Sequence, residues 1–178
     1  MSPVRTTPGL AAIMLAVLTV APACDANQRM LTMAIQNKEG VPCFSIPAET
    51  RPSGTDLKVD AIIVSEIDAA GAEVREIWTA VAPDGIDPLA VSDCIQYGVD
   101  RPSLKTRGSV GALRLGVRYD AFINASVETR RGWSNRSYAG KFCLAQSVSG
   151  LEVRQVRNGP ASDQSRWQAC NISTHDTP

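Results

Sequence analysis

The side chains that most often carry enzyme chemistry are few and widely spaced in this chain of 178 residues. The single histidine, His175, lies in a polar C-terminal stretch, and tails of this kind are usually mobile. A Ser-His-Asp or Cys-His arrangement needs a histidine that a third group holds at hydrogen-bond distance from the nucleophile. A chain terminus provides this poorly, so we expect no catalytic role for His175.

Acidic side chains are numerous enough to supply the paired carboxylates of a glycosidase. The candidates are Asp56, Asp60, Glu66, Asp68, Glu73 and Glu76. Their spacing is typical of the solvated face of an antiparallel sheet. The sequence contains no glycine-rich phosphate loop, no histidine or aspartate metal cluster and no closely spaced redox cysteine pair. We therefore expect no catalytic residues, no metal and no cofactor, in a protein that binds rather than catalyses.

The cysteines suggest structural rather than chemical roles. There are five of them, Cys24, Cys43, Cys94, Cys143 and Cys170. Exported chains favour an even number of disulfide partners, and setting Cys24 aside leaves four. Their spacing never approaches C-x-x-C, which argues against a zinc site. Four cysteines allow three pairings, and the spacing does not choose among them, but two structural disulfides of about 3–4 kcal/mol each are expected.

Residues 1–23 have the layout of a signal peptide. Arg5 precedes an apolar run over residues 10–20, and Ala21 and Ala23 give the A-x-A spacing that a signal peptidase recognises. The apolar run is too short to span a bilayer, which needs about 20 apolar residues. The pattern predicts export, and we exclude this segment from the folded part.

Cys24 directly follows the predicted cleavage site, where the lipoprotein signal peptidase requires a cysteine. Lipidation would explain both the odd cysteine and its position, and residues 24–29 would form a lipidated N-terminus and short tether. The alternative is ordinary secretion with a free or intermolecularly paired Cys24, because Ala21 is a poor match to the aliphatic residue usual at that place. Asp25 resembles an inner-membrane retention signal. We therefore expect a lipid anchor in the periplasm, with the inner membrane favoured over the outer.

One segment concentrates the residue types that are enriched at binding hot spots. Residues 129–138 contain Arg130, Arg131, Trp133, Asn135, Arg136 and Tyr138. A loop carrying these side chains could offer contact area and charge-assisted hydrogen bonds to an acidic partner. In the alternative and more common arrangement, Trp133 and Tyr138 pack into the core and the arginines are merely solvated.

Strand-like runs separated by turn residues must position these side chains. The runs cover residues 30–35, 41–46, 57–64, 74–81, 117–127, 140–145 and 151–156. The clearest is 117–127, where alternate residues from Val117 to Val127 share one face. The pattern predicts an all-β domain over residues 30–170, an antiparallel β-sandwich of immunoglobulin-like general architecture stapled by two disulfides. A flexible tail is expected over residues 171–178.

Charge and length narrow the classes of partner. The chain has 18 basic and 18 acidic residues, so it carries no electrostatic footprint for nucleic acid. The part after the signal peptide is about 155 residues long, which suits one domain with a continuous core. We expect no nucleic acid partner and no small-molecule substrate.

Several segments together resemble a family of periplasmic immunity lipoproteins of type VI secretion systems in Gram-negative bacteria. The resemblance covers most of the chain after the signal peptide and rests on the Ala23-Cys24-Asp25 junction and on residues 41–46, 92–98, 116–119 and 141–144. None of these segments is an enzymatic signature. Shorter members look as though they keep only the cysteines that match Cys43 and Cys94. This implies that these two pair, which leaves Cys143 for Cys170, and it is the connectivity we expect.

The resemblance implies a function as well as a pairing. Family members are expected to bind a secreted antibacterial effector, a toxin, and to neutralise it in the periplasm. The family transfers no binding residues to this chain, so the role of residues 129–138 is a separate hypothesis. Two alternatives stay open: a structural or assembly lipoprotein of the cell envelope with no toxin partner, and a small hydrolase.

Overall fold

The computed structural model describes residues 30–51, 57–83, 87–88, 93–148, 150–157 and 164–170. The predicted signal peptide, Cys24 and the C-terminal tail lie outside the described residues. The elements are β1 (Leu31–Thr32), β2 (Ala34–Lys38), β3 (Val41–Ser45), η1 (Ala48–Thr50), β4 (Leu57–Ile67), β5 (Glu73–Val81), β6 (Asp87–Pro88), β7 (Ile95–Gln96), β8 (Lys105–Arg107), β9 (Arg118–Thr129), β10 (Gly132–Ser147), β11 (Gly150–Val156) and η2 (Gln164–Cys170).

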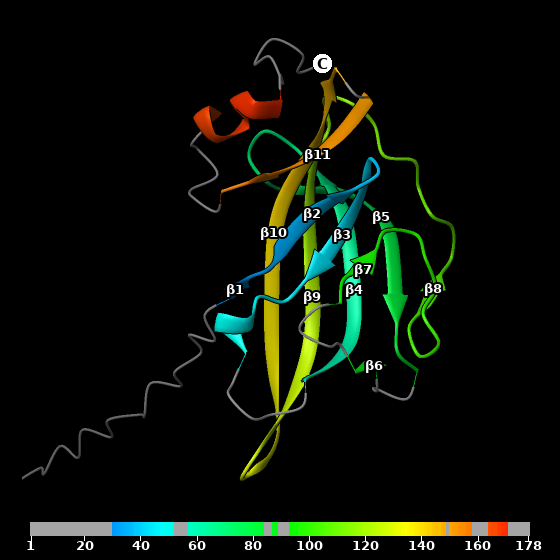
Figure 1. Ribbon diagram of the computed structural model, residues 1–178, viewed down its shortest axis with the longest axis vertical. Helices are drawn as coiled ribbons and strands as arrows, with labels where there is room; N and C mark the ends of the chain where they lie inside the picture. Colours follow the sequence, from blue (N-terminus) through cyan, green and yellow to red (C-terminus); the bar gives the residue numbers. More distant parts are fainter. Residues whose placement is uncertain are drawn as a thin grey trace, which may run out of the picture.

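The strands form two sheets that pack face to face, which confirms the predicted all-β sandwich (Figure 1). The larger sheet has eight strands with β1-β10-β9-β4-β5-β8 as its main path, while β11 pairs with β10 and β6 pairs with β4. The smaller sheet is β2-β3-β7. Strand pairs within both sheets are antiparallel, except that β1 runs parallel to β10. The two layers are therefore very unequal in size.

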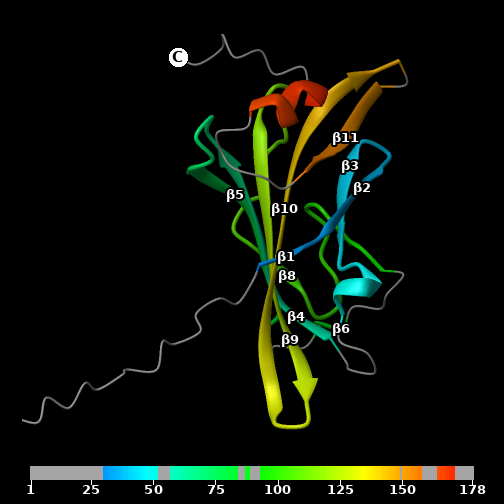
Figure 2. The ribbon, with the colours of Figure 1, turned by 90° about the vertical axis from the view of Figure 1, so that its left-hand side faces the viewer.

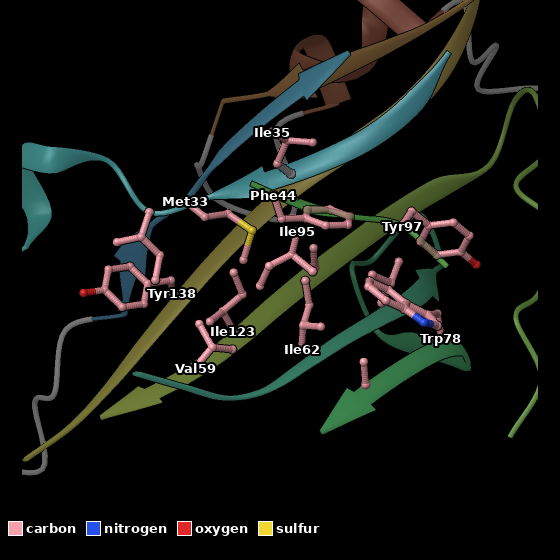
Figure 3. Close-up of a cluster of buried hydrophobic side chains, with 14 of the residues drawn as sticks. Met33, Ile35, Phe44, Val59, Ile62, Trp78, Ile95, Tyr97, Ile123 and Tyr138 are labelled. Atoms are coloured by element: carbon pink, nitrogen blue, oxygen red, sulfur yellow. The ribbon is translucent and has the colours of Figure 1, made fainter. Parts of the chain in front are cut away.

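Alternation along the long strands explains the core between the sheets. In β9, Tyr119, Ala121, Ile123, Ala125 and Val127 are fully buried, as the period-two pattern predicts, and the residues between them are partly exposed. The same face continues into neighbouring strands and meets the small sheet (Figure 3). The large side chains at this interface include Met33, Phe44, Ile62, Trp78, Ile95 and Tyr138.

One predicted boundary is wrong. The sequence places a loop at residues 129–138 and begins the next strand at 140, whereas β10 begins at Gly132 and only a tight turn at Arg130 and Arg131 separates it from β9. The reason is that residues 132–139 pair in continuous register with β9. Their polar side chains carry little local strand signal, so the neighbouring strand decides their conformation.

Both disulfides have the expected connectivity. Cys43 pairs with Cys94 and Cys143 with Cys170, with Cα–Cα distances of 5.4 Å and 5.9 Å that suit a disulfide. The first joins β3 to the segment just before β7 within the small sheet. The second ties η2 to β10. No helix among the described residues is long and apolar enough to cross a membrane.

Candidate functional site

The ends of β9 and β10 form a projecting hairpin, which we call the arginine hairpin (residues 126–137). The register runs from Gly140 opposite Ala121 to Gly132 opposite Thr129, and β4 begins only at Leu57, opposite Val127. Beyond that point the described sheet narrows to two strands, and the hairpin extends past the rest of the sandwich at the lower end of Figures 1 and 2.

Local hydrogen bonds close the turn of the arginine hairpin. The Thr129 hydroxyl donates to the carbonyl of Gly132 over 2.6 Å and accepts from the backbone N–H of Arg131 over 3.2 Å. Gly132 has a φ of 107°, a conformation that glycine adopts without strain. The two arginines are therefore displayed at the turn of a hydrogen-bonded hairpin.

The strand alternation separates the predicted binding residues. Trp133 is half-exposed at 50%, and Arg130, Arg131, Asn135 and Arg136 are also exposed. Tyr138 is different, because it lies opposite Ile123 on the core-facing side and is completely buried. Its inclusion in the binding set is wrong. Arg136 lies on the same side of β10, two residues nearer the tip and opposite Ala125, but its side chain is exposed.

No acidic side chain in the described part of the chain pairs with the arginines of the arginine hairpin. Among the described residues, no hydrogen bond or ion pair joins the guanidinium groups of Arg130, Arg131 or Arg136 to another side chain. Nearby, the ammonium of Lys58 lies 3.9 Å from the centroid of the Trp133 ring, a cation–π contact that the sequence did not reveal. The tip therefore presents several cations beside one exposed aromatic surface.

Other charged side chains have internal roles. Glu66 is 5% exposed and accepts hydrogen bonds from Arg75 at 2.8 Å and from Arg114 at 2.9 Å. Burial alone would raise the pKa of Glu66, but the hydrogen bonds and charges of the two arginines outweigh it and lower the pKa below its usual value. The Tyr119 hydroxyl also accepts from the Arg114 backbone N–H at 2.7 Å. This cluster fastens the segment around Arg114 to the large sheet.

Two of the remaining candidate carboxylates accept hydrogen bonds from other groups of the protein. Asp60 accepts from the Ser126 hydroxyl at 2.8 Å, and Asp68 accepts from the Ala72 backbone N–H at 2.8 Å in the β4–β5 turn. Glu73 and Glu76 lie on β5, and both are exposed. Asp56 and His175 lie outside the described residues. Within the described part of the chain, no group of three or more histidine, cysteine, aspartate or glutamate side chains is placed to hold a metal ion.

A shallow cavity of about 320 Å³ lies on the face of the large sheet away from the small one, near the low end of the size range of small-molecule sites. It is lined by Ile63, Ser65, Ile67, Gly71, Glu73, Asp120 and Phe122. Lys141 forms an ion pair with Asp120 at 2.6 Å. The sequence does not reveal this cavity, because its lining comes from β4, the β4–β5 turn, β5 and β9.

The arginine hairpin is thus the surface with the clearest capacity to bind. Guanidinium groups form paired hydrogen bonds with carboxylates or phosphates, and an exposed indole adds contact area. Most residues of this surface are close together in the sequence and could be predicted from it. Lys58 could not, because it comes from β4. Comparison with known proteins adds no further guide, since no protein-family model, no curated protein and no solved structure matches this chain.

Proposed function

We propose that this protein is a periplasmic lipoprotein, anchored to a membrane through lipid on Cys24, that binds a secreted antibacterial effector and neutralises it. It acts by binding and not by catalysis. The observation that carries the proposal is the arginine hairpin, a projecting surface with a half-exposed tryptophan and three exposed arginines that pair with no acid among the described residues. The likeness to immunity lipoproteins of type VI secretion systems supports the identity of the partner.

The scaffold supports tight binding. The hydrogen-bonded turn and the continuous β9–β10 register preorganise the hairpin, and a preorganised surface loses less conformational entropy when it binds. Structural disulfides are also typical of an oxidising compartment such as the periplasm.

Charge indicates the kind of surface that the partner presents. Arginine and tryptophan dominate binding hot spots, and unpaired guanidinium groups favour an acidic surface. Because Arg130 and Arg131 lie at the turn, they reach the partner before the rest of the sandwich. An effector with an acidic patch or cleft fits this arrangement.

The first test is co-purification. The domain from Asp25 onward, without lipid, is used as bait in a lysate of the source organism, and retained proteins are identified. Recovery of a secreted toxin, in particular a cell-wall or membrane hydrolase, would support the proposal. Recovery only of peptidoglycan-associated or envelope-assembly proteins would instead favour a structural lipoprotein with no toxin partner.

A triple variant then tests whether the arginine hairpin is the surface that binds the effector. The triple change Arg130→Ala, Arg131→Ala and Trp133→Ala is expected to weaken effector binding by at least about 100-fold, since hot-spot residues contribute about 2 kcal/mol or more each and are not additive. The matched control is Arg107→Ala with Arg157→Ala, which removes the same charge from exposed arginines elsewhere. Equal affinity of the triple variant and the wild type, with both folded, would eliminate the hairpin as the interface.

A further inference from the structure

The arginine hairpin has an open strand edge in addition to its side chains. On the side of β10 away from β9, β1 pairs with Tyr138 and Ala139, and β11 pairs with residues 141–147. No described strand pairs with residues 132–137 on that side. These six residues therefore form an edge within the part of the chain that the structure describes.

The direction of the backbone groups along this edge follows from one hydrogen bond. The N–H of Met33 donates to the carbonyl of Ala139 over 3.1 Å, so the backbone of Ala139 points away from β9. Backbone groups in an antiparallel strand alternate with a period of two. Trp133, Asn135 and Ser137 therefore direct their N–H and C=O groups to the open side as well.

The protein protects comparable edges but not this one. Residues 73–76 of β5 also have no described strand on the side away from β4. They carry three charged side chains, however, and two register shifts interrupt their pairing with β4. Charges and bulges of this kind block unwanted strand pairing. Residues 132–137 contain one charged residue and no proline or lysine, and their register with β9 is continuous. The geometry of β10 permits another strand to be added.

A side chain closes the strand edge where β11 faces the small sheet. The side chain of Gln155 on β11 accepts from the backbone N–H of Ile35 at 2.9 Å and donates to the carbonyl of Met33 at 2.8 Å. A side chain thus satisfies backbone groups where β11 faces the small sheet. Residues 132–137 have no equivalent contact among the described residues, which sets this edge apart.

We propose that residues 132–137 accept an extended segment of the effector as an added β-strand. This inference rests on the proposed function. Strand addition takes its affinity from main-chain hydrogen bonds and its specificity from the flanking side chains. Arg136 on one face and Arg130 and Arg131 at the turn favour a segment that carries carboxylates, and Trp133 on the other face offers it an apolar contact. The partner chemistry is therefore an acidic extended segment.

Proline substitution separates the backbone edge from its side chains. Asn135→Pro removes an N–H that points to the open side, leaves the ladder with β9 in place and suits an edge strand. Ser137→Pro makes the same change at a second position. Asn135→Ala and Ser137→Ala are the matched controls, because they alter the side chain and keep the N–H.

The assay uses the full chain in its own organism, so the effector need not be purified. A strain that lacks the gene is mixed with the parent strain on solid medium, and survivors are counted after complementation with each variant at equal protein abundance. We expect the deletion strain to be killed by its parent. Wild type and both alanine variants should restore survival, and both proline variants should fail to do so.

The outcomes distinguish the two proposals. If the deletion strain survives contact with its parent, the proposed function is overturned, and this inference falls with it. If the strain is killed but both proline variants protect it, the effector does not use this edge and only the inference is overturned. The free domain should keep its thermal midpoint within about 3 °C in both proline variants. A larger loss in both, or conversion of a dimer to a monomer, would show that the edge already pairs within the chain or with a second copy, which also overturns the inference.

Discussion

The Cys143–Cys170 disulfide holds a small second core that is separate from the main one. Phe142 and Leu144 belong to the core between the sheets, whereas Cys143 between them faces the other side of β10. There it packs with Ile67, Val156, Cys170 and the fully buried Trp167 of η2. We predict that replacing both cysteines by alanine releases η2 while the main sandwich stays folded.

The size of the effect follows from the contacts of η2. Burial of Trp167 stabilises the docked η2 by about 4–6 kcal/mol. Docking also covers Ile67 and Val156, which adds roughly 1 kcal/mol for each. The cation–π contact of Arg118, 5.3 Å from the ring, adds about 1 kcal/mol. Ordering the backbone of the seven residues of η2 costs about 7–14 kcal/mol. The favourable and unfavourable contributions are therefore of similar size. The disulfide, with a sequence separation of 27, adds about 3.5 kcal/mol and decides the balance.

Iodide quenching of tryptophan fluorescence measures the release. In a Trp133→Phe background the two other tryptophans, Trp78 and Trp167, are 1% and 2% exposed, so quenching at 25 °C should be weak. The double alanine change at Cys143 and Cys170 should make about half of the emission accessible below the thermal midpoint.

The control is the double alanine change at Cys43 and Cys94. This bridge lies in the small sheet and spans 51 residues, so its loss costs about 4 kcal/mol and lowers the thermal midpoint by about 8–16 °C without local exposure of Trp167. The reasoning would be refuted if Trp167 stayed protected from iodide without its own disulfide, or if the two double variants lowered the midpoint equally.

Two further predictions concern the large sheet. Glu66→Gln removes the negative charge that pairs with Arg75 and Arg114 and one of the two acceptor oxygens. It should cost about 1–2 kcal/mol at pH 7, which urea unfolding measures. Since the folded state lowers the pKa of Glu66, its contribution is present above the unfolded value near 4.3 and is lost as pH falls through the folded value. The wild type should therefore approach the variant in stability below about pH 4, and a constant difference would contradict this. Gly140→Ala places a Cβ 2.8 Å from Met33 Cγ and should lower the free energy of unfolding by about 1–3 kcal/mol. An unchanged thermal midpoint would show that the neighbouring side chains move aside without cost.

Much of the strand pattern could be predicted from the sequence because it is local. The alternation in residues 117–127 predicts both the strand and its buried face, and five of its six apolar residues are buried in the structure while Val117 packs partly against the core. The odd cysteine count likewise separates Cys24 from four disulfide partners. These signals work because each depends on neighbouring residues or on a simple parity rule.

The candidate site was predicted only in part. Arg130, Arg131 and Trp133 are local in sequence and are exposed together, as the hypothesis requires. The burial of Tyr138 was missed, because a segment read as a loop has no alternation to assign its faces. Lys58 was also missed, since the strand that brings it to Trp133 is far away in the chain.

The sequence by itself determined which segments are extended, which faces of them are apolar and that four cysteines should pair. Only the tertiary structure decided that residues 132–137 continue as a strand with one open edge, and that Glu66 meets Arg114, 48 residues away. It also decided among three cysteine pairings that the spacing left open. The physical reason is that side-chain periodicity records which face of a strand is buried, whereas edges, pairings and long-range charge contacts depend on which strands become neighbours.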